Sequence, residues 1–145
     1  MILRHFEISD IRNIKAYRYP NKTDLEILAM INDWNKGDCS GRYFEMFTIA
    51  HGGQAVGEIF AYEHTKDTVS IGVHVYKPFR NKGFAAFGIN TALTLVAQKG
   101  YNYAISLIDE QNLPAKNLFV KIGFNPNGSF IDPNGFTVCT YKKQL

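Results

Sequence analysis

Apolar and polar residues alternate along the chain in segments that predict strands and helices. A period of two residues, with β-branched residues at alternate positions, is typical of strands, and apolar residues three or four positions apart are typical of helices. By this rule strands are predicted at 2–8, 43–50, 55–64, 68–75, 103–108, 124–130 and 136–142. Helices are predicted from a cap at Ser9 or Asp10 through Tyr17, from 23 or 24 up to the glycine at 37, from 85 up to the glycine at 100, and at 112–122.

The connections between these elements predict a mixed sheet. The Gly52-Gly53 pair favours a tight hairpin, so the strands between residues 43 and 75 form an antiparallel meander. The strand at 103–108 is almost entirely apolar, which favours burial on both faces. A strand, a helix and a parallel strand in this order form a right-handed crossover.

The composition predicts one globular domain spanning residues 1–145. Apolar residues make up 46 % of the chain and charged residues 20 %, which allows a sizeable core. The net charge of +3 is too small to indicate a nucleic-acid partner. No segment approaches the roughly 18 apolar residues of a membrane span, and charges interrupt the start where a signal peptide needs an apolar run. Cys39 and Cys139 show neither metal-ligand spacing nor a disulfide framework, so we expect a cytoplasmic protein without a metal.

A basic turn with one glycine lies between the strand at 68–75 and the helix that follows it. Arg80 and Lys82 carry positive charge, and Gly83 stands where the helix begins. Free N–H groups in the first turn of a helix, together with the helix dipole, favour an anion at that end. Glycine has no side chain to keep a phosphate from the backbone. The sequence therefore predicts an anion-binding loop.

The same loop resembles a family signature. Residues 80–85, Arg-Asn-Lys-Gly-Phe-Ala, read R-x-x-G-x-A and resemble the pyrophosphate-binding signature of the GNAT superfamily, whose members are acetyl-CoA-dependent N-acetyltransferases. Residues 112–124 are similar to the family's N-x-x-A-x-x-L-[YF]-x-x-x-G-F segment. The resemblance implies the GNAT fold: a mixed α+β protein in which a central, mostly antiparallel sheet of six to seven strands has helices on both faces.

The resemblance also implies acetyl-CoA as co-substrate and the residues that would hold it. Backbone groups of Val73 and Val75 would bind the pantetheine arm, in a gap that opens toward the next parallel strand. The pyrophosphate would rest beside Arg80 on the N–H groups of Asn81, Lys82, Gly83, Phe84 and Ala85. Asn112 is either a pantetheine ligand or the N-cap of its helix, and Lys116 is a further candidate for the phosphates.

Acetyl transfer to an amine needs a proton acceptor, a donor for the oxyanion and a way for the CoA thiolate to leave. In many members of the resembled family a tyrosine protonates the thiolate, and Phe119 stands at that position here. A phenyl ring cannot donate a proton, but a thiolate is a tolerable leaving group. The candidate bases are Glu58, which faces either solvent or a pocket, and His74, which alternates with Val73 and Val75 and so faces away from them.

Three functions are open from the sequence. The leading one is direct acetyl transfer to a primary amine of a small molecule or a protein N-terminus. An acyl-CoA-binding or sensing module with impaired catalysis is the second, and Phe119 favours it. A Rossmann-type dinucleotide domain is disfavoured because G-x-G-x-x-G is absent. The acceptor is not specified, and the C-terminal hairpin could pair across a homodimer.

Overall fold

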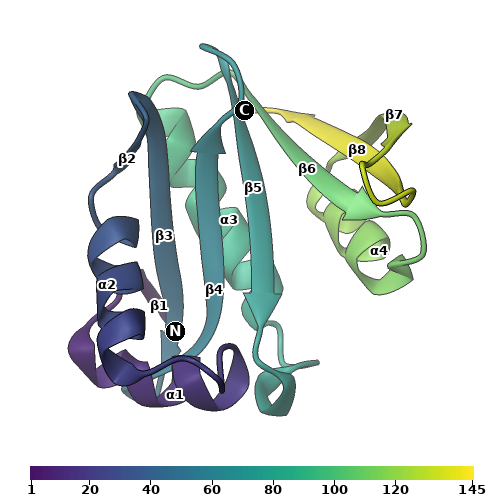
Figure 1. The fold of residues 1–145 in the computed structure, drawn as a ribbon. Coiled ribbons are helices and arrows are strands. Elements are labelled where there is room, and N and C mark those ends of the chain that lie inside the picture. Colours follow the sequence, from purple (N-terminus) through teal and green to yellow (C-terminus); the bar gives the residue numbers. More distant parts are fainter.

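The computed structural model describes residues 1–145, which form a single twisted sheet with helices on both faces (Figure 1). The strands are β1 (Ile2–Arg4), β2 (Asp38–Cys39), β3 (Arg42–His51), β4 (Gln54–Glu63), β5 (Thr68–Val75), β6 (Tyr103–Asp109), β7 (Asn125–Ile131) and β8 (Thr137–Gln144). The helices are α1 (Ile11–Tyr17), α2 (Asp24–Trp34), α3 (Phe84–Gln98) and α4 (Leu113–Ile122), with short 3-10 turns η1 (Ile8–Asp10) and η2 (Lys77–Phe79).

The sheet has the order β1-β3-β4-β5-β6-β8-β7, and β5–β6 is its one parallel pair. The mixed, mostly antiparallel architecture is therefore confirmed. The number of strands is eight and not six to seven, because the two-residue strand β2 also pairs with β3. A pair of only two residues carries no period that the sequence pattern could show.

The strand expected at residues 2–8 is wrong in its extent. Only Ile2–Arg4 pairs with β3, and the chain then turns into η1. Asp10 stabilises this turn because its carboxylate accepts the Glu7 N–H at 2.8 Å and also binds the Arg4 guanidinium at 2.8 and 3.0 Å. The first helix consequently begins at Ile11 with Asp10, one of the two predicted caps, as its N-cap.

The two faces of the sheet are covered by different helices. The main core lies between the sheet and α3, where Ile49, Ile59, Ile71 and Ile89 are completely or almost completely buried. A β-carbon at Gly88 of α3 would lie 2.8 Å from side-chain atoms of Ile49 and Ile59, so the glycine sets this close packing. A smaller apolar cluster packs α1 and α2 against the opposite face.

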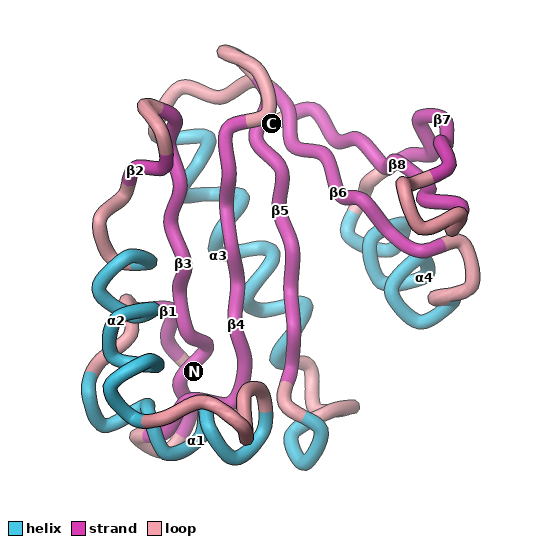
Figure 2. The backbone as a smooth tube through the Cα atoms, viewed as in Figure 1, coloured by secondary structure: helices cyan, strands magenta, loops and turns pink.

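Strands β5 and β6 separate after a short parallel stretch, as Figure 2 shows. They pair only from Thr68–Tyr103 to Ser70–Ile105, although β5 continues to Val75 and β6 to Asp109. The second half of β5 and the second half of β6 therefore have free backbone edges that face each other across a gap. The gap divides the sheet into an N-terminal part and an arm formed by β6, β8, β7 and α4.

The pairing of β4 with β5 depends on Gly57. A β-carbon there would lie 2.8 Å from the His74 carbonyl oxygen and 3.1 Å from the Val75 Cα, both of them backbone atoms that cannot rotate away. We predict that Gly57→Ala lowers the free energy of unfolding by about 1–3 kcal/mol, measured by urea denaturation. Ser70→Ala on β5 is the control and should change it by less than about 0.5 kcal/mol. Equal midpoints for Gly57→Ala and the parent would contradict the close approach of these strands.

Candidate active site

The loop between β5 and α3 presents a row of unbonded amide groups. None of the N–H groups from Asn81 to Ala86 has an acceptor within the protein, whereas the Phe87 N–H already bonds the Gly83 carbonyl at 3.2 Å. Asn81 and Gly83 adopt left-handed backbone angles, with φ of 63° and 82°. This conformation turns the chain sharply into a helix of 15 residues, whose N-terminus favours a bound anion.

A cavity of about 340 Å³ lies at this loop, between the end of β5 and the helices α3 and α4. Seven of the ten residues predicted to bind the cofactor line it: Val73, Val75, Arg80, Asn81, Gly83, Phe84 and Ala85. The Arg80 Nε donates to the Val75 carbonyl at 3.0 Å, so the guanidinium is held at the end of β5. Lys82, Asn112 and Lys116 do not line this cavity.

A second cavity of about 240 Å³ occupies the gap between β5 and β6. It shares Val73 and Ala115 with the first cavity and reaches Phe60, whose side chain lies on the opposite face of the sheet. Asn112 lines this cavity and also caps α4, because its Oδ1 accepts the Ala115 N–H at 3.2 Å. The two cavities together lead from the amide loop through the sheet.

The strand β5 directs the amides of Val73 and Val75 into this gap. The Tyr76 N–H donates to the Val56 carbonyl at 2.9 Å, so the even-numbered residues at this end of β5 bond to β4. Because antiparallel strands alternate their bonding edges, the odd-numbered residues point the other way, toward β6. There β6 is out of reach beyond Ile105. Val73 and Val75 therefore face the gap with free backbone groups, and their contact with the cofactor stays a prediction.

Residues 8–124 of the chain match the family model of the acetyltransferase (GNAT) family. The chain belongs to this family. Its fold is similar over 99 % of the chain to a chimera of the Vibrio cholerae spermidine N-acetyltransferase SpeG and hSSAT, at 17 % identity, 96 % coverage of that chain and a TM-score of 0.81. A ribosomal-protein-alanine N-acetyltransferase from Brucella melitensis aligns over the full length of both chains, at 15 % identity and a TM-score of 0.80.

A structure of yncA from Salmonella typhimurium with its cofactor acetyl-CoA also has this fold. It covers 100 % of the chain and 94 % of its own, at 14 % identity and a TM-score of 0.76. At these identities the likeness shows the GNAT fold alone. No curated protein matches the sequence at a significant level.

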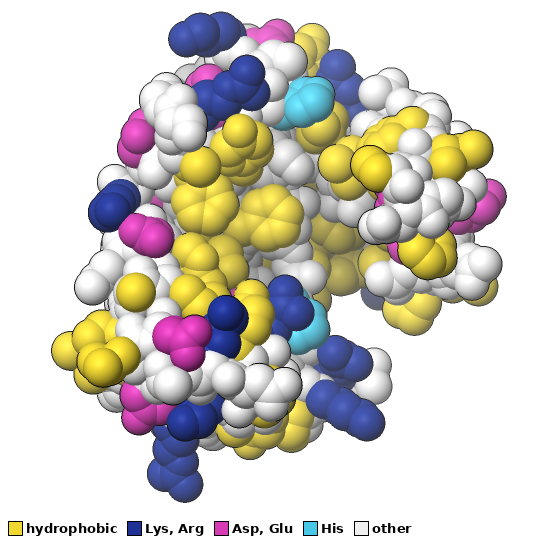
Figure 3. All heavy atoms as spheres, viewed as in Figure 1, with side chains coloured by type: hydrophobic (Ala, Val, Ile, Leu, Met, Phe, Trp, Pro, Cys, Tyr) yellow, Lys and Arg dark blue, Asp and Glu magenta, His cyan; other side chains and the backbone are white.

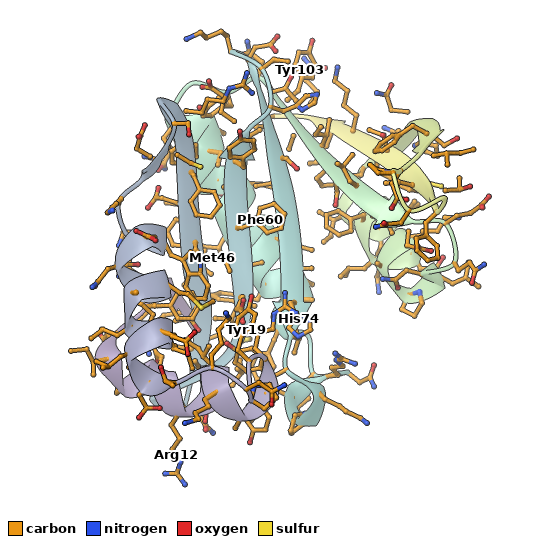
Figure 4. All side chains as sticks on the ribbon, viewed as in Figure 1. Arg12, Tyr19, Met46, Phe60, His74 and Tyr103 are labelled. Carbon is orange, nitrogen blue, oxygen red and sulfur yellow. The ribbon has the colours of Figure 1, made fainter.

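Glu58 and His74 lie next to each other on the sheet face that is opposite α3. They are direct cross-strand partners on β4 and β5. Each alternates with residues that pack against α3, so His74 does face away from Val73 and Val75 (Figure 4). The structure thus brings together the two candidate bases of this GNAT protein. Of the two positions considered for Glu58, the solvent face is excluded, because the residue is only 2 % exposed.

The Glu58 carboxyl is buried without a hydrogen bond. Neither of its oxygens has a partner, and the nearest cation is the Arg18 guanidinium, with Nε at 3.7 Å from Oε1. Burial raises the pKa of Glu58, and the neighbouring Tyr76 hydroxyl and Arg18 guanidinium offset part of the increase. The Tyr76 hydroxyl is itself buried and makes no hydrogen bond. A carboxylate with a raised pKa and free lone pairs is suited to accept a proton.

His74 has the opposite shift. Burial lowers its pKa, and the positive charges of Arg18 and Arg80 lower it further. The imidazole is therefore neutral at physiological pH, and it lies against the Tyr76 ring with centroids 6.1 Å apart. A neutral imidazole can take a proton, but its lowered pKa makes it a weaker base than an ordinary histidine.

Sequence reasoning missed Arg18 and Tyr76, and the phosphate-binding roles of Lys82 and Lys116 stay predictions. Arg18 follows α1 and meets Glu58 only through the packing of that helix on the sheet, a contact that no local pattern indicates. Tyr76 could have been found, because it directly follows the strand that enters the loop. The Lys116 Nζ donates to the Glu110 carbonyl at 3.1 Å, which accounts for its position without a phosphate.

Phe119 fills the place expected of the family's tyrosine and is buried in the α3 side of the core. Its ring packs edge-on against Phe124, with centroids 5.0 Å apart. It also lines the cavity between β5 and β6, where Ser106 supplies a hydroxyl from the opposite strand. No aromatic hydroxyl occupies the Phe119 position, so this GNAT site lacks the usual acid there.

The features outside the two cavities at the gap do not add to this site. A hollow of about 490 Å³ beside α1 and the β3–β4 hairpin shares no residue with the two cavities at the gap. No His, Cys, Asp or Glu side chains gather in groups of three or more in a way that would hold a metal. None of the helices combines the length and the apolar character needed to cross a membrane.

Proposed function

We propose that this GNAT protein, as one domain over residues 1–145, transfers the acetyl group of acetyl-CoA directly to the primary amine of a small molecule or a protein N-terminus. The observation that supports this most strongly is the route through the sheet. It begins at six unbonded amides, passes between two free strand edges and reaches Phe60, two residues along β4 from the buried Glu58 carboxyl. Neighbouring folds named for spermidine and for ribosomal proteins support both acceptor classes.

The residues of the route fit the parts of acetyl-CoA in order. The pyrophosphate fits the N–H groups of residues 81 to 86, with Arg80 close by. The pantetheine amides fit the free edge of β5 at Val73 and Val75, in the manner of an added strand. The thioester then lies near the Phe60 end of the gap, on the face that carries Glu58 and His74.

Glu58 is the proposed base. The amine nitrogen attacks the thioester carbonyl carbon, a C–N bond forms, and the nitrogen gives up a proton to the Glu58 carboxylate, directly or through one water. The Val75 N–H is the proposed donor to the oxyanion. The C–S bond then breaks and the electron pair leaves with the CoA sulfur. His74, neutral and adjacent, orients the amine or the water.

The leaving thiolate needs no strong acid. A thiol with an ordinary pKa of about 8.5 is a stable enough anion to depart at neutral pH. Phe119 is therefore compatible with catalysis, although it is also the feature that favours a module that only binds acyl-CoA. Turnover of any amine distinguishes the two functions.

The test combines binding and turnover. Isothermal titration with acetyl-CoA should show saturable binding, whereas NAD, as the control, should show none. Release of free CoA thiol in the presence of a mixture of primary amines should then exceed the amine-free rate. Binding without amine-dependent release would identify a binding module, and absence of acetyl-CoA binding would remove the basis of the proposal.

A further inference from the structure

The sheet face around Glu58 is a shallow apolar floor. On β3 and β4 the alternation that places Glu58 on this face also places Phe44, Met46, Phe60 and Tyr62 there. Figure 3 shows hydrophobic side chains gathered on this face, between the helices α1 and α2 and the hollow beside the C-terminal arm. Met46 and Phe60 lie toward the viewer with His74 in Figure 4. We call these four side chains the apolar floor.

Phe60 joins the apolar floor to the gap through which acetyl-CoA is proposed to pass. Its ring lies across Gly72, where a β-carbon would come within 1.9 Å of the ring, so the glycine makes room for it. The side chain is 38 % exposed and also lines the cavity between β5 and β6. An acceptor that reaches the thioester from this face therefore contacts Phe60.

The charge on this face fits a single ammonium group. Glu58 is the one carboxylate among the side chains that β3, β4 and β5 direct to it. The nearby acidic residues of the N-terminal segments are engaged elsewhere: Asp10 binds Arg4, Asp24 binds Lys15, and Glu26 caps α2. Arg18 adds a positive charge beside Glu58, and His74 adds a neutral imidazole. Across the gap, Asp109 lines the cavity that Phe60 reaches, and its Oδ1 already accepts the Gln111 N–H at 2.8 Å. A second ammonium on this face would therefore meet no free carboxylate.

We propose that the acceptor is a small apolar monoamine, of the alkyl or arylalkyl class. Its amine lies at Glu58 and its apolar part lies on Phe60 and the rest of the apolar floor. This inference rests on the proposed acetyl transfer and narrows the acceptor to one class. The floor supplies binding energy for each buried methylene, whereas the charge pattern disfavours diamines and polyamines.

Two matched pairs of amines test the class. Hexylamine and 1,6-diaminohexane differ only in the second amine, and 2-phenylethylamine and ethylamine differ only in the ring. We expect kcat/KM, measured by CoA thiol release at fixed pH, to be at least about tenfold higher for hexylamine and for 2-phenylethylamine than for their partners. A diamine that equals or exceeds hexylamine would overturn the inference and leave acetyl transfer intact. Acetyl-CoA binding without turnover of any of the four would also overturn the inference, and turnover of a peptide with a free N-terminus would then decide whether acetyl transfer stands.

Variants at the floor test the role of Phe60. In Phe60→Ala the ratio of kcat/KM for 2-phenylethylamine to that for ethylamine should fall about tenfold, and Gly72→Ala should change it in the same direction by displacing the ring. The ratio cancels any change in acetyl-CoA binding. Phe136→Ala, at a 59 % exposed phenylalanine between β7 and β8, should keep the parental ratio. An unchanged ratio in Phe60→Ala would show that the floor does not bind the acceptor.

Discussion

Replacing Glu58 with glutamine should lower kcat for amine acetylation by about 100-fold or more and leave the Kd for acetyl-CoA unchanged. Positioned general bases contribute about 10²–10⁴-fold, and glutamine keeps the shape of the side chain while losing the ability to accept a proton. The carboxyl lies across the sheet from the amide loop, so the cofactor contacts are unaffected. Steady-state thiol release and isothermal titration measure the two quantities.

Matched variants separate the proton acceptor from its surroundings. Glu110→Gln makes the same chemical change at an exposed turn residue and should keep parental kcat. His74→Gln should reduce kcat by less than Glu58→Gln if histidine only orients the amine. The reverse order would make His74 the base. Retention of more than a third of the parental kcat in Glu58→Gln would exclude Glu58 from that role.

The pH dependence gives the same assignment a second test. Burial raises the pKa of Glu58 above its ordinary value of 4.5, so the acidic limb of kcat/KM should lie above that value and disappear in Glu58→Gln. The free energy of unfolding should fall over the same pH range in which activity rises. Because the folded protein binds the Glu58 proton more tightly than the unfolded chain, the parent loses stability as pH rises from about 4.5 through the raised pKa. Glu58→Gln should therefore gain melting temperature relative to the parent across this window, and keep the gain at higher pH.

A buried carboxyl without a hydrogen bond opposes stability. Each unit of pKa difference between the folded and unfolded states corresponds to about 1.4 kcal/mol. The surrounding strands supply apolar burial that outweighs this cost, with Ile59 and Ala61 completely buried next to Glu58. Stabilisation together with loss of activity in one variant is the expected result where a side chain is kept for chemistry.

The anion loop and the order of the elements could be predicted because local signals specify them. Thr68–Val75 is the strand that alternation predicts, and Gly83 begins the helix in the left-handed conformation that glycine favours. Seven of the residues assigned to the cofactor through the family resemblance line one cavity for the same reason, since they lie on one strand end, one turn and one helix start.

The base could not be assigned from the sequence because its environment depends on register. Period-two alternation gives Glu58 and His74 their faces only if no bulge intervenes, and one irregularity does occur in the β3–β4 pairing, between Ile49 and Ala50. The β4–β5 register is regular, so the two residues meet. The surroundings of Glu58 depend further on the packing of α1, because Arg18, which follows α1 and lies 40 positions earlier in the chain, contacts the Glu58 carboxyl.

The loop itself is tested by giving Gly83 a side chain, which should weaken acetyl-CoA binding about 100-fold. A β-carbon at Gly83 meets no protein atom within 4 Å, so a side chain there enters the space in front of the loop without disturbing the packing of the protein. That space adjoins the unbonded amides, each of which offers a phosphate a charge-assisted hydrogen bond of about 1.5–3 kcal/mol. Blocking one or two of them accounts for a 100-fold change.

The choice of substitution decides what such an experiment measures. Gly83 has a φ of 82°, so Gly83→Val adds backbone strain of about 1–3 kcal/mol to the steric block. Gly83→Asn avoids most of this strain because asparagine tolerates left-handed angles. Gly128→Asn, at a glycine with φ of 92° and open space in β7, is the matched control and should bind acetyl-CoA as the parent does. Both side chains block the space in front of the amides, but only valine adds much backbone strain. Comparable losses of acetyl-CoA affinity in Gly83→Val and Gly83→Asn would therefore locate the phosphates at this loop. Parental affinity in Gly83→Asn would mean that the anion lies elsewhere.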